Sequence, residues 1–175
     1  MAGFCIVLLM MGFFVPILII AIMVFLVVAV ITIFNYFMES FALYRLCKNN
    51  DYKNPILAWI PFYNRVILGE FADNKKMGYA TFILNIIYWI LFFIFIYFID
   101  YIPEGIRNIW STGITVISLV TYVLNIILVH LIMKKCIPKA ADILTVINVF
   151  TFGISKAIVL FVLRNNDKLI GQEVI

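Results

Sequence analysis

Residues 77–99 read MGYATFILNIIYWILFFIFIYFI and hold 23 residues without a charged side chain. A helix needs about 20 apolar residues to cross the hydrocarbon core of a bilayer, which is about 30 Å thick. Tyr79 lies near one end of the stretch and Tyr97 near the other, as the aromatic belts of membrane proteins predict. We therefore expect 77–99 to be a transmembrane helix.

The composition of the whole chain agrees with this expectation. Of its 175 residues, 66% are hydrophobic and 13% are charged, and the mean hydropathy is +1.14. An average soluble protein is about 25% charged. A soluble domain of this size exposes about a third of the surface of its unfolded chain, which is too much for so apolar a sequence. A soluble globular domain is excluded, and an all-α integral membrane protein is expected.

We expect one membrane domain over residues 1–175, a helical bundle with three transmembrane helices and one or two broken, re-entrant or interfacial segments. Its predicted parts are an apolar N-terminal segment with the first span at 1–46, a broken re-entrant segment at 55–72, spans at 77–99 and 111–133, a span or re-entrant hairpin at 140–163, and a polar tail at 164–175.

The N-terminal segment is too long for one span. Residues 1–38 carry no charge, and a helix over the whole apolar run would be about 65 Å long. Pro16 removes a backbone donor and kinks or starts a helix. We expect a principal span at 17–46, preceded by a kinked or partly embedded segment at 1–15. Two tight spans are the alternative.

The segment 55–72 is shorter than a span. Asn54 and Pro55 form a helix-start signal, and Pro61 interrupts the apolar residues that follow. The polar run FADNKK at 71–76 closes it. A re-entrant or interfacial segment is the expected structure.

The segment 140–163 allows two structures. A full span would place the cation Lys156 inside the bilayer, at a cost of about 2.5–3.5 kcal/mol at the centre. A re-entrant hairpin that breaks near Gly153 would keep Lys156, Arg164 and Lys168 on one side. The hairpin is favoured and the span stays open.

The basic residues predict the orientation. The loops at 45–55, 65–76 and 134–139 would share one side. The opposite loop, 100–110, has Arg107 as its single basic residue. Basic loops are cytoplasmic in most membrane proteins. We therefore expect a multi-pass protein of the cell membrane with loop 100–110 outside. The nine cations on the inner side are Arg45, Lys48, Lys53, Arg65, Lys75, Lys76, Lys134, Lys135 and Lys139.

Three cysteines without close spacing, Cys5, Cys47 and Cys136, argue against a disulfide framework or a zinc site. Cys47 and Cys136 do, however, occupy similar places in two halves of the chain. In each half, an expected span leads into a basic loop with one cysteine and then into a broken apolar segment. This pattern is compatible with a parallel internal repeat or with chance.

The most distinctive stretch is ALYRLCKNNDYKNPILAWIPFYNRVILGEFAD, residues 42–73. It resembles small, uncharacterised multi-pass membrane proteins of Gram-positive bacteria, which share an Ala-Trp-Ile-Pro-x-x-Asn motif. The resemblance implies a membrane protein and no particular activity. Arg65 stands where those proteins often have an aliphatic residue. The matching positions are Ala58, Trp59, Ile60, Pro61, Asn64, Leu68 and Gly69.

This motif also supplies the first candidate site. Pro61 frees a backbone carbonyl, and that carbonyl, Asn64 and Arg65 could bind an ion, an anionic headgroup or a peptide. The alternative is an interfacial anchor, because Trp59 and Arg65 both favour the headgroup zone. Glu39 is an intramembrane carboxylate that could pair with Arg45 or Arg65.

Polar side chains on the spans give further candidates. Thr115, Ser118, Tyr122 and Asn125 share one face of 111–133, because their steps of 3, 4 and 3 match the helical period. They would join helices or line a pocket with a second polar face on 77–99. That second face holds Asn85 and Tyr88.

His130, the single histidine, lies one turn from the basic end of its span. It is an interface residue or a proton-sensitive switch, and one histidine makes no metal site.

The sequence contains no nucleophile motif, phosphate-binding glycine loop or metal-ligand spacing, so we expect no enzyme, metal or cofactor. The favoured function is a non-catalytic subunit or accessory protein of a membrane complex. Its partners would be lipids and other membrane proteins or copies of itself, and not nucleic acid. A small oligomeric transporter or channel with its site at the broken segments is one alternative, and a bacteriocin-immunity or membrane-stress protein is another.

Overall fold

The computed structural model describes residues 2–151 and 153–165, and over 2–13 it describes the backbone. These residues form helices and short connections, and the described part of the chain has no strand. Three helical segments are long and apolar enough to cross a membrane: Phe14–Asn49, Lys75–Phe98 and Glu104–Cys136. The prediction of an all-α membrane protein with three spanning helices is confirmed. The elements are α1 (Ala2–Asn49), the 3₁₀ helix η1 (Pro55–Trp59), α2 (Asn64–Phe71), α3 (Lys75–Phe98), α4 (Glu104–Cys136), α5 (Ala141–Phe150) and α6 (Ile154–Leu163).

The chain divides into two compact units, Met1–Phe37 and Met38–Ile175. The first consists of the N-terminal part of α1, whose helix runs on through Pro16. The helix is therefore continuous from the predicted segment at 1–15 into the predicted span at 17–46, and a partly embedded 1–15 stays a prediction. No polar side chain near Pro16 offers its neighbours' backbone groups another partner, and a proline is tolerated inside membrane helices.

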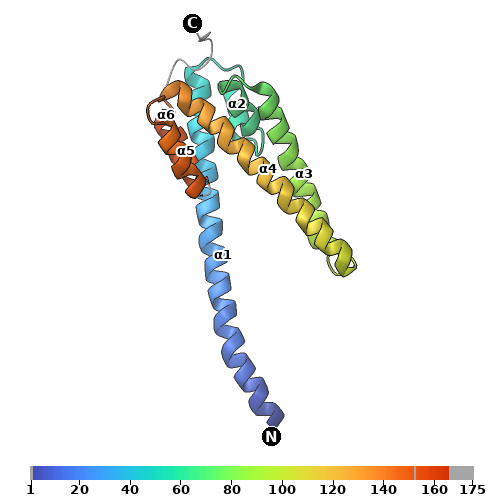
Figure 1. Ribbon diagram of the computed structural model, residues 1–175. Helices are drawn as coiled ribbons and strands as arrows, with labels where there is room; N and C mark the ends of the chain where they lie inside the picture. The colour runs from blue at the N-terminus through green and yellow to red at the C-terminus, as the bar shows by residue number, and fades with distance from the viewer. Residues whose placement is uncertain (1, 152, 166–175) are drawn as a thin grey trace. The chain divides into compact units, whose positions relative to one another are not determined.

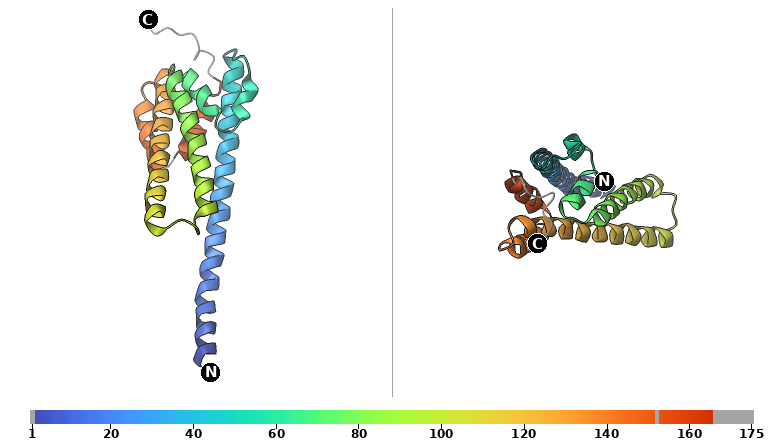
Figure 2. Two further views of the ribbon diagram at one scale, coloured as in Figure 1. Left: turned by 90° about the vertical axis from the view of Figure 1, so that its right-hand side faces the viewer. Right: turned by 90° about the horizontal axis from the view of Figure 1, so that it is seen from above.

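In the second unit, α3 and α4 run side by side and are joined by the short connection 99–103 (Figure 2). The polar loop predicted at 100–110 is shorter than expected, because Glu104–Trp110 already belong to α4. Glu104 lies in the first turn of that helix, where a negative charge interacts favourably with the helix dipole.

Both broken segments are broken where the sequence predicts. The first ends η1 at Trp59, turns through Pro61 and Phe62, and begins α2 at Asn64. Phe62 has a φ of 68°, a left-handed conformation that is strained for an aromatic residue. This turn redirects the chain into the bundle.

The second broken segment forms a hairpin, α5 and α6, after α4 (Figure 1). Gly153, with a φ of 86°, makes the reversal. Each helix has 10 residues and is therefore about 15 Å long, half the thickness of the hydrocarbon core. This is the hairpin alternative and not the full span.

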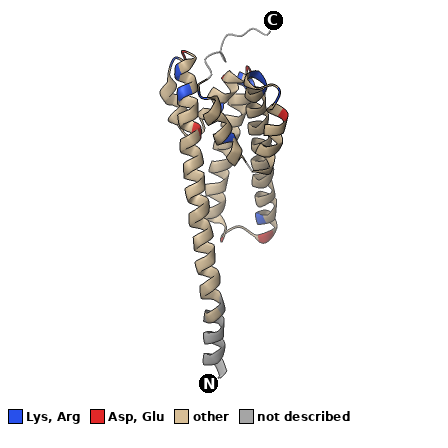
Figure 3. Ribbon diagram, turned by 90° about the vertical axis from the view of Figure 1, so that its left-hand side faces the viewer, with Lys and Arg blue, Asp and Glu red and all other residues tan. Residues whose placement is uncertain are grey.

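The core of the second unit lies where α2 and the ends of α1, α4 and α6 meet. Lys and Arg, blue in Figure 3, gather mainly at this end of the unit. We call it the basic end. The largest buried apolar side chains of the core are Leu43, Leu46, Ile67, Leu68, Phe71, Leu128, Ile132, Met133 and Leu160.

Two glycines allow α2 and α3 to touch. A Cβ added to Gly69 would lie 2.5 Å from the Cα of Gly78, and one added to Gly78 would lie 2.9 Å from the backbone oxygen of Arg65. This close contact between α2 and α3 therefore positions the first turn of α2, which carries Arg65, against α3. Close approach through small residues is a common packing mode of membrane helices.

We expect Gly69→Ala and Gly78→Ala each to lower the free energy of unfolding by about 1–3 kcal/mol, because the added methyl meets backbone. Gly113→Ala on α4 is the matched control, since its Cβ would meet nothing within 4 Å. Unfolding of the purified chain in detergent measures the difference. Equal stability of Gly69→Ala and Gly113→Ala would contradict this packing.

Candidate functional site

Three charged side chains from α1, α2 and α6 meet inside the second unit. The Arg65 guanidinium donates through Nη1 to Oε1 of Glu39 at 2.6 Å. The Lys156 ammonium contacts the other carboxylate oxygen, Oε2, at 2.7 Å. Each oxygen of Glu39 therefore has a cation of its own. We call Glu39, Arg65 and Lys156 the charge triad.

The triad is buried well below the basic end. The side chains of Glu39, Lys156 and Arg65 are 7%, 11% and 18% exposed. Glu39 precedes the exposed Arg45 by six residues along α1, which is about 9 Å of helix. Charges at such depth are stable only when they are paired and hydrogen-bonded.

The two broken segments supply both cations. Arg65 is the second residue of α2, directly after the Pro61 turn. Lys156 is the third residue of α6, directly after the Gly153 turn. In both halves, a short helix after a turn therefore brings a cation in its first turn to Glu39. The proposed internal repeat remains a prediction, although both halves place a cation in this way.

The sequence identified two members of the triad and missed the third. Pairing of Glu39 with Arg65 was one of two alternatives, and the structure has Arg65 and not Arg45. From its sequence position, Lys156 is expected only to be costly inside the bilayer. One signal could have found it: Lys156 is the single cation within the apolar segment 140–163, and Glu39 is an acidic group that needs a partner.

The ion pairs of the triad include none of the other motif residues. Asn64, next to Arg65, is 2% exposed, and its Oδ1 has no hydrogen-bond partner in the described chain. Trp59 ends η1 and is half-buried, whereas Pro61 is exposed in the turn. Pro61 thus sets the start of α2.

Polar contacts tie the connections together at the basic end. Lys135 at the end of α4 donates to the backbone oxygen of Phe71 at 3.0 Å and forms an ion pair with Asp73. Burial, followed by the nearby Glu70 carboxylate, raises the pKa of the Tyr52 hydroxyl above its usual value.

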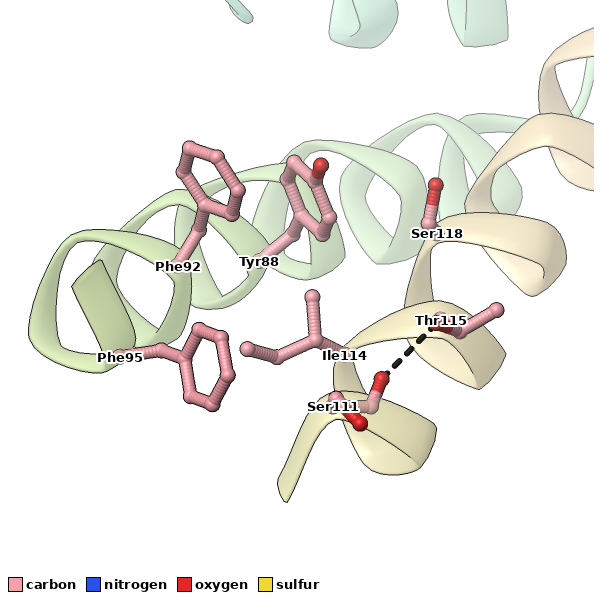
Figure 4. Close-up of a pocket in the computed structure, with 7 residues that line it drawn as sticks. All are labelled: Tyr88, Phe92, Phe95, Ser111, Ile114, Thr115 and Ser118. Carbon is pink, nitrogen blue, oxygen red and sulfur yellow. Dashed lines mark hydrogen bonds between the residues drawn. The ribbon is translucent and has the colours of Figure 1, made fainter. Parts of the chain in front are cut away.

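A second feature is an open pocket of about 310 Å³ between α3 and α4. In Figure 4, three aromatic side chains of α3 lie on one side and four residues of α4 on the other. Three residues of the predicted polar faces, Tyr88, Thr115 and Ser118, line this pocket. The lining consists of Tyr88, Phe92, Phe95, Ser111, Ile114, Thr115 and Ser118.

The pocket hydroxyls differ in their partners. Thr115 donates to the backbone oxygen of Ser111 at 2.8 Å, so it is satisfied within its own helix. The hydroxyls of Tyr88 and Ser118 have no hydrogen bond to any described residue. The pocket is therefore apolar with two available hydroxyls.

The remaining candidates make structural contacts. The Tyr122 hydroxyl donates to the backbone oxygen of Val149 at 3.0 Å and so joins α4 to α5. Asn125 and Asn85 each donate to the backbone of their own helix, to Thr121 and Thr81 respectively, at 2.9 Å. These two amides do not join helices through those bonds.

His130 contacts the α5 hairpin. Its Nδ1 lies 2.7 Å from the Thr145 hydroxyl oxygen, and that hydroxyl donates to the backbone oxygen of Ala141. Because the hydroxyl has one proton, Nδ1 of His130 is the donor. Nε2 lies 3.9 Å from the exposed Asp142 carboxylate. His130 is thus an interface residue between α4 and α5.

Among the described residues, no group of three or more His, Cys, Asp or Glu side chains could hold a metal ion. Comparison of the chain with protein families, curated proteins and solved structures finds no match. The residues themselves therefore carry the functional argument.

Glu39→Ala should lower the free energy of unfolding by about 3–5 kcal/mol, because it leaves two buried cations without their counterion. The triple variant Glu39→Leu/Arg65→Met/Lys156→Met should recover most of that loss, since it removes all three charges together. Unfolding in detergent measures both. Glu104→Gln, at an exposed carboxylate, is the control. A Glu39→Ala protein as stable as the control would refute the buried triad.

Proposed function

We propose that this chain is a non-catalytic subunit or accessory protein of a membrane complex, and that a transmembrane helix of a partner protein packs into the pocket between α3 and α4. The observation that carries the proposal is Tyr88, which lines this pocket and whose hydroxyl has no hydrogen-bond partner in the described chain.

Depth makes this hydroxyl informative. Tyr88 follows the start of α3 by 13 residues, which is about 20 Å of helix and places it near the middle of the span. Water is scarce there, and acyl chains offer no acceptor. A tyrosine hydroxyl extends too far from its own helix to bond to the backbone of that helix. A polar group on a neighbouring membrane helix would satisfy it.

The packing of the two spans supports the same proposal. On α3, the buried residues are Gly78 and Thr81, both near the basic end. The rest of α3 carries exposed apolar side chains, such as Phe93, which is 62% exposed. Hence most of this helix is available to lipid or to a partner.

The orientation is part of the proposal. The gathering of Lys and Arg at one end of the second unit supports a cytoplasmic basic end and an external 99–103 connection. The resemblance of 42–73 to small membrane proteins of Gram-positive bacteria supports a location in the cell membrane of such a bacterium. The basic end would then face anionic lipid or cytosolic partners.

A pocket-filling variant tests this function. Affinity purification of the tagged chain from its native membranes in mild detergent should yield one membrane protein in a fixed ratio. Ser118→Phe should reduce that yield about tenfold or more, because the ring occupies the space of the partner side chains. Val116→Phe is the matched control, since Val116 is 55% exposed and lies outside the pocket lining.

Tyr88→Phe, which removes only the hydroxyl, should weaken the complex less than Ser118→Phe. Mass measurement of the purified species decides the outcome. A lone monomer would contradict the proposal, as would a complex made of copies of this chain only. Equal yields from Ser118→Phe and Val116→Phe would exclude the pocket as the interface.

A further inference from the structure

We propose that the charge triad is a binding site for an oxyanion of the phosphate class. The inference rests on the charges and hydrogen-bond donors of Glu39, Arg65 and Lys156. It goes beyond the subunit function and is independent of it, because the pocket between α3 and α4 contains none of these residues.

The charges of the triad do not balance. At pH 7 it holds two cations and one carboxylate, a net charge of +1. Both carboxylate oxygens of Glu39 are already paired, at 2.6 and 2.7 Å. No other acidic side chain in the described part of the chain forms an ion pair with Arg65 or Lys156. An uncompensated buried charge costs several kcal/mol, so a bound anion would stabilise this arrangement.

The donors of the triad are also in excess. An ammonium has three N–H donors, and that of Lys156 has one described acceptor, on Glu39. The Nε of Arg65 is buried without an acceptor. Arginine presents a planar fork of donors that matches phosphate oxygens, and lysine adds a compact charge. Together these groups suit a ligand with several anionic oxygens.

Glu39 has a positioning role in this site. It holds the two cations next to each other, on opposite oxygens of one carboxylate. The anion would approach from the Arg65 side, because that side chain is 18% exposed, more than either partner. Two sources carry this chemistry: the phosphate of a lipid headgroup and free phosphate from the aqueous side.

The test compares triads of different charge. Lys156→Gln keeps a donor for Glu39 and brings the net charge to 0, whereas Glu39→Gln brings it to +2. Lys53→Gln, at an exposed lysine in the connection 50–54, removes a cation elsewhere and is the control. The full chain is purified in a neutral detergent and unfolded by heat at pH 7, in sodium phosphate or in sodium chloride of equal ionic strength.

A second arm identifies the source. Native mass spectrometry measures retention of phosphatidylglycerol, with diacylglycerol as the lipid that lacks a phosphate. Stabilisation by sodium phosphate identifies free phosphate as a ligand, and retention of phosphatidylglycerol alone identifies the headgroup.

We expect the wild type and Lys53→Gln to be stabilised by phosphate or to retain phosphatidylglycerol. Lys156→Gln should bind about tenfold more weakly or worse, the loss expected for one charged hydrogen bond. Glu39→Gln should depend on the anion more strongly than the wild type.

If Glu39→Gln fails to fold, the comparison of Lys156→Gln with Lys53→Gln still decides whether the triad binds the anion. The inference is overturned if the wild type is neither stabilised by phosphate nor retains phosphatidylglycerol. It is also overturned if Lys156→Gln binds these anions as well as Lys53→Gln does. Failure here leaves the partner-helix pocket untouched, because Ser118→Phe tests that surface separately.

Discussion

A carboxylate below the basic end of a membrane helix requires a partner, and the second unit is organised around that requirement. Glu39 receives Arg65 on one oxygen and Lys156 on the other. Each cation lies in the first turn of a short helix that follows a turn. A continuous span through 140–163 would carry Lys156 past Glu39 into lipid. The breaks at Pro61 and Gly153 therefore place Arg65 and Lys156 next to Glu39.

The packing around the triad is uneven along the unit. Near the basic end, α2 touches α3 through Gly69 and Gly78, and apolar side chains of several helices form one core. Farther along α3 and α4, the two helices keep an open pocket with an unpaired tyrosine hydroxyl. The closed end suits a stable binding site, and the open end suits contact with lipid or another protein. The two proposals accordingly concern different parts of the molecule.

Much of this fold could be predicted from the sequence, because span length and hydropathy depend on local composition. The breaks could be predicted too, since proline and glycine act through their own backbone. The continuity of α1 through Pro16 could not be predicted, because a proline in a uniformly apolar stretch can start, kink or stay within a helix. The length of the 100–110 loop was overestimated, because polar residues in the first turns of a helix have the composition of a loop.

The triad could be predicted only in part. Glu39 and Arg65 are recognisable as charges near the membrane that need partners. The contact with Lys156 joins residues 117 positions apart and depends on how the hairpin α5–α6 folds back. No local pattern contains that information. Likewise, the spacing on α4 predicts a polar face, but it does not reveal that Thr115 bonds to its own helix while Ser118 stays available.

The contact between Lys156 and Glu39 can be measured directly in a bilayer. Solid-state NMR of the full chain in liposomes, with ¹⁵Nζ-labelled lysine and ¹³Cδ-labelled glutamate, detects their dipolar coupling. The spectrum of Lys156→Gln, subtracted from that of the wild type, isolates this one pair. The structure predicts a coupling of directly contacting groups that disappears in the variant. Identical spectra would show that Lys156 lies away from Glu39 and would contradict the triad.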